Sequence, residues 1–424
     1  MAAAPEKPRH RPGRLRQATA GWSPLPPSGP LRTVAGATLV NTVGTGLWSA
    51  GAAVFLTRNV GLSAAEVGLG LGAAGLAGLT ASVPLGRLAD RRDPRRVRAV
   101  LQVMQGCVAC AYLFIGSFPA FLLVAVLDAL LVSGNLPVRA ALISAVAGPT
   151  TRVRAFAAMR AVANIGISTG AGLAAVALLA DTRLGYLLLV GGNALTYLIS
   201  AGLLMRLPSM PRAAAAPPPS ARGVLRDWRF LLVSAAAAVL GLHQVLLALV
   251  LPLWIVGRTS APAVMISVVL LTNTALTVLL AVRLSTGAES AFGAARMLRR
   301  ASWLLAVALL LYAATGTVGT AAAVILLVGA TLVFTLGDLL QSTGSAALAY
   351  GLASTEAVGA YQGGHQLIAD LVQAGGTTLL VLLLIDGPSA GWLLLAGVFV
   401  LTGLATPALT ARALRTATWS GGAG

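Results

Sequence analysis

Long apolar segments, separated by short polar stretches, make up most of this chain. A helix of about 20 mainly apolar residues is long enough to cross a bilayer. Twelve segments reach this length, and they predict an all-α membrane protein with twelve transmembrane helices. Their ranges are 33–57, 64–86, 96–117, 119–147, 154–180, 184–206, 229–256, 262–284, 296–315, 319–347, 357–385 and 389–413.

The longest non-apolar stretch in the middle of the chain divides the segments into six and six. Residues 207–228 contain three consecutive prolines and several arginines. We therefore expect two six-helix bundles, residues 33–206 and 229–415, joined by a cytoplasmic linker. Residues 1–32 are rich in Pro, Arg and Ala and are expected to be a disordered cytoplasmic tail. Residues 416–424 are expected to be a second cytoplasmic tail.

The distribution of charge determines the expected orientation. The chain has 30 Lys and Arg against 12 Asp and Glu, a formal net charge of +18. If the N-terminus is cytoplasmic, only Arg58, Arg183 and Arg258 lie outside, and the other 27 of the 30 basic residues lie in or beside cytoplasmic segments. Short cytoplasmic loops collect Lys and Arg. The pattern predicts a multi-pass protein of the cell membrane with both termini in the cytoplasm, and no nucleic-acid partner.

The sequence offers little for catalysis. It contains three His and no metal-ligand cluster, phosphate-binding loop or dinucleotide fingerprint. Cys107 and Cys110 form a Cys-x-x-Cys pattern inside one apolar segment, where we expect them to be small packing residues. We therefore expect no enzymatic activity, no cofactor and no metal.

One basic stretch between the second and third segments carries a family signature. The residues that make up the signature are Gly86, Leu88, Asp90, Arg91 and Arg95. This pattern resembles the loop between helices 2 and 3 of the major facilitator superfamily. The Gly that usually follows the Asp-Arg pair is absent here, and a proline takes over the turn.

The resemblance covers residues 33–415 and is closest to the branch that exports drugs and metabolites. It implies two six-helix bundles that alternate between inward-open and outward-open states. In the resembling family, the Asp at the position of Asp90 meets the N-terminal end of helix 11 when the cytoplasmic side closes. Helix 11 of this chain is expected to begin near Ser354, Thr355 and Glu356.

The resemblance also implies a function. It points to a secondary transporter that exports a small organic molecule in exchange for protons, working as a monomer in the lipid bilayer. A nutrient importer or facilitator of the same fold stays open as an alternative. A non-transporting membrane sensor or scaffold is a second alternative, which a large soluble domain would favour; this sequence contains none.

Ionisable residues inside the apolar segments are the candidates for proton coupling. A charge at the centre of a bilayer costs roughly 2.5–3.5 kcal/mol on insertion scales, so it is seldom placed there without a role. The candidates are Asp370, His365, Asp338 and Asp128. Proton or substrate work and a purely structural polar pair are both open for them. Asp370 and His365 are five residues apart on one helix and need not touch.

A second set of residues predicts the wall of a substrate cavity. Asn41, Thr45 and Trp48 share one face of the first helix at helical spacing, and helix 1 lines the central cavity in the resembling family. His243 and Gln244 lie near the centre of the seventh helix. Packing between helices is the alternative interpretation of these residues.

Arg139 and Arg160 lie within a turn or two of the predicted cytoplasmic face. Long basic side chains in such positions usually extend back to the membrane surface. We expect both to do so, with pairing to the signature loop as an alternative for Arg139.

Overall fold

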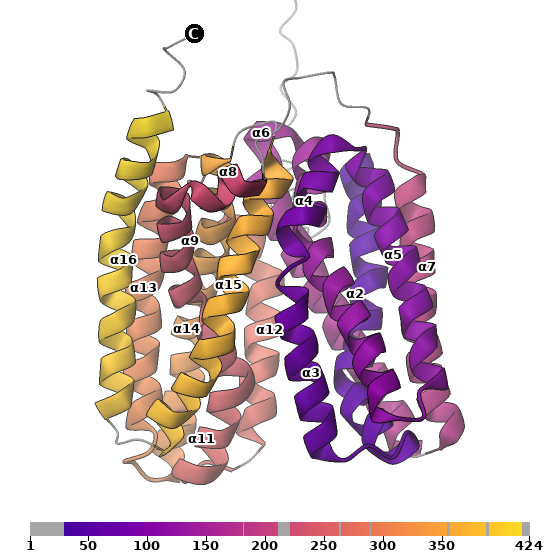
Figure 1. Ribbon diagram of the computed structural model, residues 1–424. Helices are drawn as coiled ribbons and strands as arrows, with labels where there is room; N and C mark the ends of the chain where they lie inside the picture. Colours follow the sequence, from indigo (N-terminus) through magenta and orange to yellow (C-terminus); the bar gives the residue numbers. More distant parts are fainter. Residues whose placement is uncertain are drawn as a thin grey trace, which may run out of the picture.

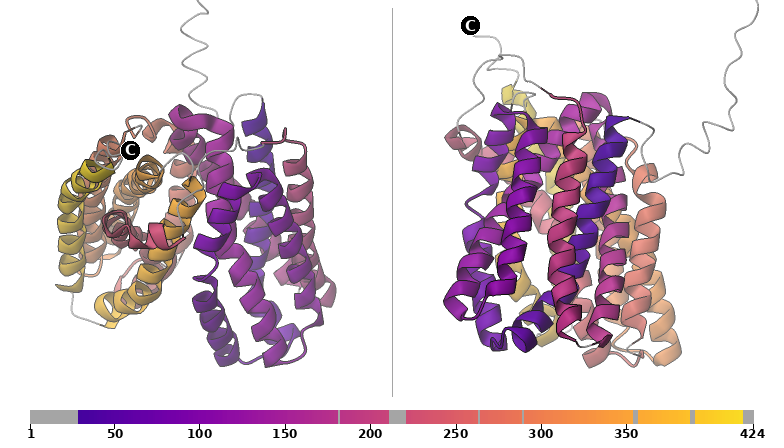
Figure 2. Two further views of the ribbon diagram at one scale, coloured as in Figure 1. Left: turned by 45° about the horizontal axis from the view of Figure 1, so that its top comes forward. Right: turned by 90° about the vertical axis from the view of Figure 1, so that its right-hand side faces the viewer.

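The computed structural model of the protein describes residues 29–180, 182–210, 221–262, 264–288, 290–353, 357–386 and 390–417. Within these ranges the regular structure is entirely helical. Figure 1 shows the helices standing side by side in two groups, and Figure 2 shows the same groups from two further directions. The prediction of an all-helical membrane protein is confirmed.

The N-terminal half forms the group drawn from indigo to magenta (Figure 1). α6 contains two spans, because Gly148 has a φ of 72° and interrupts the helix there. The elements are α2 (Pro30–Val54) continued by η1 (Phe55–Asn59), α3 (Ala64–Gly78), α4 (Ser82–Arg91), α5 (Pro94–Ala111) continued by η2 (Tyr112–Phe114), α6 (Phe118–Ala180) and α7 (Arg183–Met205).

The C-terminal half forms the second group, and a short helix in the predicted linker precedes it. The elements are α8 (Ala221–Arg226), α9 (Trp228–Gly241), α10 (His243–Val245), η3 (Leu246–Val250), α11 (Leu251–Arg258), α12 (Met265–Leu284), α13 (Ala291–Ala314), α14 (Thr320–Leu352), α15 (Val358–Val381) continued by η4 (Leu382–Asp386), and α16 (Ala390–Ala417). The α9–α11 elements together make one interrupted span.

Each of the twelve predicted segments coincides with one of these helices, helix pairs or halves of α6. By length and apolarity alone, eight helices of the described chain could cross a membrane, and α3 with α4, bent by 43°, would make a ninth.

Side-chain caps decide where several helices begin. Ser63 accepts a hydrogen bond from the backbone N–H of Glu66, whose carboxylate accepts one from the Ser63 N–H, so α3 begins with a capping box. Ser290 caps α13 in the same position, which starts that helix five residues before the predicted residue 296. The predicted features at residues 1–28, 211–220, 354–356 and 418–424 lie outside the described residues.

Glycines bring α2 and α6 into close contact. A Cβ atom on Gly46 would collide with the carbonyl oxygen of Ile167, and one on Gly170 would collide with the carbonyl oxygen of Val43. Lipid chains are as apolar as leucine, so membrane helices associate through such close packing rather than through the hydrophobic effect. The small residues therefore account for the tight N-terminal bundle.

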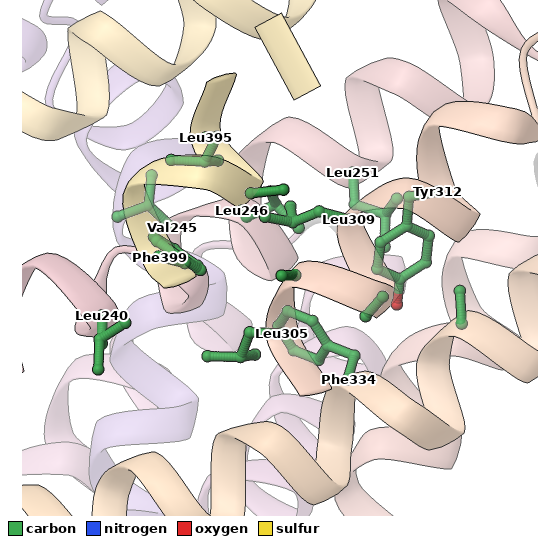
Figure 3. Close-up of a cluster of buried hydrophobic side chains, with 14 of the residues drawn as sticks. Leu240, Val245, Leu246, Leu251, Leu305, Leu309, Tyr312, Phe334, Leu395 and Phe399 are labelled. Atoms are coloured by element: carbon green, nitrogen blue, oxygen red, sulfur yellow. The ribbon is translucent and has the colours of Figure 1, made fainter. Parts of the chain in front are cut away.

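The C-terminal bundle has a larger apolar core made by several of its helices. Figure 3 shows part of it, where Leu246, Leu309 and Phe334 lie near Tyr312. The Tyr312 hydroxyl is within 3.1 Å of the Thr331 hydroxyl, so its polar end is satisfied inside the core. This core holds α14 in place, and α14 carries the acidic residue of the site described next.

Candidate functional site

A cavity of about 440 Å³ lies between the two halves of the chain. Its wall comes from α6 on one side and from α9, α10, α14 and α15 on the other. This volume falls in the range of roughly 300–1,000 Å³ that is typical of small-molecule sites. The lining is rich in amides, hydroxyls and small apolar side chains, and the ionisable residues in it are Arg139, Arg160 and His365.

An ion pair beside the cavity joins the two halves. Nη2 of Arg160, on α6, donates to both carboxylate oxygens of Asp338, on α14, at 2.8 and 2.7 Å. Nε2 of His243 lies 2.6 Å from Oδ1 of the same carboxylate, and its Nδ1 lies 2.7 Å from the carbonyl oxygen of Leu240. Asp338 is 3% exposed and His243 is 1% exposed, so the group is closed off from bulk water.

The hydrogen bonds of this group need one more proton than a neutral His243 and an ionised Asp338 carry together. Both ring nitrogens of His243 face oxygen acceptors. A neutral imidazole has one N–H. Either the ring is doubly protonated, so that Asp338 lies between two cations, or Asp338 itself carries the proton. The Asp338–His243 contact is thus a place where a proton can be held or given up.

Irregular helix geometry positions His243. α9 ends at Gly241, a turn follows at Leu242, and the π-helical segment η3 begins three residues after His243. Such π-helical segments are frequent at functional sites. The ring of Phe334 packs 5.4 Å from the imidazole, which fixes the orientation of the ring toward Asp338.

A second contact joins the halves at the end of the bundle where α4 and α8 lie, here called the linker end (top of Figure 1). The two carboxylate oxygens of Asp90 accept hydrogen bonds from the backbone N–H groups of Gly359, at 2.7 Å, and Ala360, at 2.6 Å. These N–H groups belong to the first turn of α15, which begins at Val358. Free N–H groups and the helix dipole make such a terminus attractive to a carboxylate.

Glycine is required at this contact because the two backbones touch. A Cβ atom on Gly86 would collide with the carbonyl oxygen of Gly359. Toward the other end of the molecule α3 and the lower part of α15 run apart (Figure 1). The structure is therefore closed at the linker end.

The other signature residues lie around this contact. The guanidinium of Arg95 donates to Asp93 at 3.2 Å and to the carbonyl oxygen of Leu207 at 2.5 Å. This second bond ties the loop to the end of the N-terminal bundle. Leu88 and Arg91 are both exposed.

A family model described as Major Facilitator Superfamily matches residues 34–377. The chain belongs to the major facilitator superfamily. It is therefore a multi-pass secondary transporter of small molecules and not an enzyme. No curated protein sequence matches the chain.

Solved structures of other proteins support the fold of this major facilitator. The chain is similar to the human organic anion transporter MFSD10, with 16% identity, a TM-score of 0.68 and coverage of 90% of this chain and 100% of that one. A bacterial homologue of the iron transporter ferroportin, in its outward-facing state, has 15% identity, a TM-score of 0.69 and coverage of 91% and 99%. The transporter FucP, in its outward conformation, has 13% identity, a TM-score of 0.64 and coverage of 91% and 98%.

Two of the predicted proton-coupling residues of this major facilitator lie on α15 but do not meet. Nε2 of His365 is 2.9 Å from the Ser345 hydroxyl on α14, and the side chain lines the cavity. Asp370 accepts a hydrogen bond from Gln366 at 2.7 Å. Their part in proton coupling stays a prediction.

The residues predicted on helix 1 are separated from the cavity. Asn41, Thr45 and Trp48 are not among the residues that line it. The Trp48 ring packs 4.5 Å from the ring of Tyr112 inside the N-terminal bundle. Asp128 lies near Tyr112, so it belongs to this bundle as well. Their predicted roles in substrate contact and proton coupling remain predictions.

The two residues predicted on the seventh helix lie on different surfaces of it. Gln244 lines the cavity, whereas His243 points to Asp338 instead. The expectation for the two arginines was wrong. Arg160 is held by Asp338 and Arg139 lines the cavity, so neither simply extends to the membrane surface.

Proposed function

We propose that this major facilitator is a proton antiporter that exports a small organic molecule, a drug or a metabolite, by alternating access. The observation that carries the proposal is the ion pair between Arg160 and Asp338, with His243 on the same carboxylate, at the wall of a central cavity. It links a group that can take up a proton to a contact between the two moving halves. The printed name of MFSD10, an organic anion transporter, supports a small organic substrate.

Protonation of Asp338 would weaken the contact between the halves. A neutral carboxyl group attracts Arg160 far less than a carboxylate does, and removing one partner of a buried ion pair costs about 3–5 kcal/mol. A proton therefore favours the conformation in which the two residues are apart, because a ligand shifts an equilibrium toward the state that binds it better. Release of the proton restores the ion pair and the conformation described here.

The proposal places the linker end in the cytoplasm of a cell membrane, with both termini on that side, and the protein acts as a monomer. The concentration of arginine in the α4–α5 loop and near the linker supports this orientation. The conformation closed at the linker end is then outward-facing. Substrate would enter from the cytoplasm in the opposite state and leave from this one as protons bind.

Cysteine labelling tests the orientation. Single cysteines introduced at positions 20, 215 and 387, all outside the described residues, should differ in their reaction with a membrane-impermeant reagent on intact cells. We expect label at position 387 only. Label at position 215 from outside would overturn the twelve-helix arrangement.

Transport assays test the function. Cells with and without the protein are compared for resistance to a panel of toxic compounds, and a compound that passes is then tested in proteoliposomes with an imposed pH gradient. Asp338→Asn should abolish uphill transport and leave downhill exchange, and the α4–α5 loop variant Asp93→Asn should transport normally. Accumulation of a solute in energised cells would overturn export in favour of import, and uphill transport by Asp338→Asn would overturn the coupling role.

A further inference from the structure

One wall of the central cavity carries positive charge that no described acidic residue neutralises. Arg139, on α6, lines the cavity, and no described residue forms an ion pair or a hydrogen bond with its side chain. Behind it, on α5, Arg98 is 1% exposed, and its Nε and Nη1 have no hydrogen-bond partner within the described part of the chain. The two guanidinium groups are close enough for their charges to repel.

The acidic residues of the described membrane interior are engaged elsewhere. Asp338 already lies between Arg160 and His243, and it is absent from the cavity lining. The other contacts join Asp90 to α15, Asp128 to Tyr112, and Asp370 to Gln366. The described cavity lining contains no Asp or Glu, so its charge is net positive.

A buried cation beside a half-buried one, with no counter-ion for either among the described residues, is energetically unfavourable. Taking a charge out of water costs several kcal/mol even after the protein relaxes, and only a partner of opposite charge offsets this. The side-chain nitrogen of the buried Gln102, one helical turn after Arg98, is a further donor without a described partner. The missing partner is a negatively charged group with several hydrogen-bond acceptors.

We propose that the substrate of this transporter is an organic anion whose carboxylate or phosphate group binds Arg139, with Arg98 adding to the attraction from behind. The inference rests on the proposed transport function and specifies its substrate class. The guanidinium fork matches carboxylate and phosphate geometry. The cavity has room for an organic body beyond the anionic group, and the amides of Gln244, Gln341 and Gln362 line the rest of it.

Charged thiol reagents test the potential of the cavity without any knowledge of the substrate. The exposed Cys107 and Cys110 are replaced by serine, and Ala163, in the cavity wall, is replaced by cysteine. Purified protein is treated with an anionic sulfonatoethyl or a cationic trimethylammonioethyl methanethiosulfonate, and each rate is divided by the rate with free cysteine. We expect the anionic reagent to be favoured.

Substitutions test whether Arg139 is the source of the positive electrostatic potential in the cavity. Arg139→Gln should lower the anionic preference by about threefold to tenfold, the effect of one nearby charge at intermediate dielectric constant. Arg139→Lys should preserve it, because the charge remains. Arg206→Gln, which removes an exposed arginine at the end of α7, should leave it unchanged. A preference for the cationic reagent, or no change with Arg139→Gln, would overturn the inference.

Direct binding separates an organic anion from an inorganic one. Thermal unfolding of the purified protein is measured with naphthalene-2-carboxylate, its matched carboxamide, sodium phosphate and sodium chloride, since a ligand that binds the folded state raises the unfolding temperature. We expect stabilisation by the carboxylate and not by the carboxamide, and its loss in Arg139→Gln. Stabilisation by the inorganic salts alone, or equally by the carboxamide, would overturn an organic anion as substrate. Neither readout needs transport, so failure here would leave proton-coupled export standing, and failure of pH-driven transport would leave the anion site standing.

Discussion

Replacing Asp90 by Asn should shift the protein away from the conformation closed at the linker end. Asp90 accepts two hydrogen bonds of 2.7 and 2.6 Å from the first turn of α15. Asn retains one acceptor oxygen, turns an N–H₂ donor toward a backbone donor and removes the charge. A carboxylate at a partly buried helix N-terminus contributes up to about 2 kcal/mol, and a hydrogen bond to a charged group about 1.5–3 kcal/mol.

These two contributions overlap, so we take about 2–3 kcal/mol as the loss. Each 1.4 kcal/mol changes an equilibrium constant tenfold. The ratio of linker-end-closed to linker-end-open molecules should therefore fall by about 30- to 140-fold. Folding and membrane insertion should be preserved, because the lost hydrogen bonds join the two halves and not the helices within one half.

Distances between spin labels measure this ratio. Labels are attached to cysteines at Arg92, beyond α4, and at Gly351, near the end of α14, both of which are exposed. Cys107 and Cys110 are replaced by serine beforehand. Asp90→Asn should populate a longer distance and slow transport.

Asp93→Asn is the matched control for this experiment. It removes the same charge from the same loop, but Asp93 pairs with Arg95 and Arg96 rather than with α15. Its distance distribution should match that of the unmodified protein. If Asp90→Asn also leaves the distances and transport unchanged, the carboxylate does not hold the linker end closed.

Three further predictions follow from the site. Arg160→Gln leaves a buried carboxylate without its main partner and should lower the free energy of unfolding by about 3–5 kcal/mol. Adding Asp338→Asn to this variant should recover part of the loss. Equal unfolding temperatures of the single and double variants would contradict this. Gly86→Leu places a side chain against Gly359, so spin-label distances should show an open linker end, and a closed one would refute the steric argument. Asp370→Asn should abolish pH-driven transport and keep downhill exchange, and unaltered accumulation would make Asp370 structural.

The fold could be predicted from the sequence because the bilayer sets the length of its elements. About 20 apolar residues are needed wherever the chain crosses, and this constraint recurs along the chain. The ends were less certain, since they depend on side-chain caps. The start of α13 moved to Ala291 because Ser290 accepts a hydrogen bond from the backbone of Gly293.

Only two of the three residues in the ion-pair group at the cavity could be singled out from the sequence. Asp338 and His243 stood out as polar residues in apolar segments, but Arg160 was assigned to the membrane surface. Arg160 lies six residues inside its predicted segment and Asp338 nine residues from the end of its own on the same side. At 1.5 Å per residue they are about 9 and 14 Å deep, which an arginine side chain can span. Similar depth from the same side was thus an available signal in the sequence, whereas the helix irregularity that orients His243 was not.

The Asp90 and Asp338 contacts between the halves explain how a proton on Asp338 could promote opening of the linker end, although it does not touch Asp90. Asp90 binds the start of α15 at the linker end, and Asp338 binds Arg160 deeper in the bundle. If each half moves as a packed unit, opening the linker end separates both pairs in the same movement, and their free energies oppose that movement together. A proton on Asp338 removes one of the two contributions. What remains is the contribution of Asp90 and of the hydrogen bonds that Arg152 donates to the Tyr350 carbonyl and that the Tyr350 hydroxyl donates to the Ala140 carbonyl. Contacts at the opposite end, or substrate in the cavity, then have less to offset.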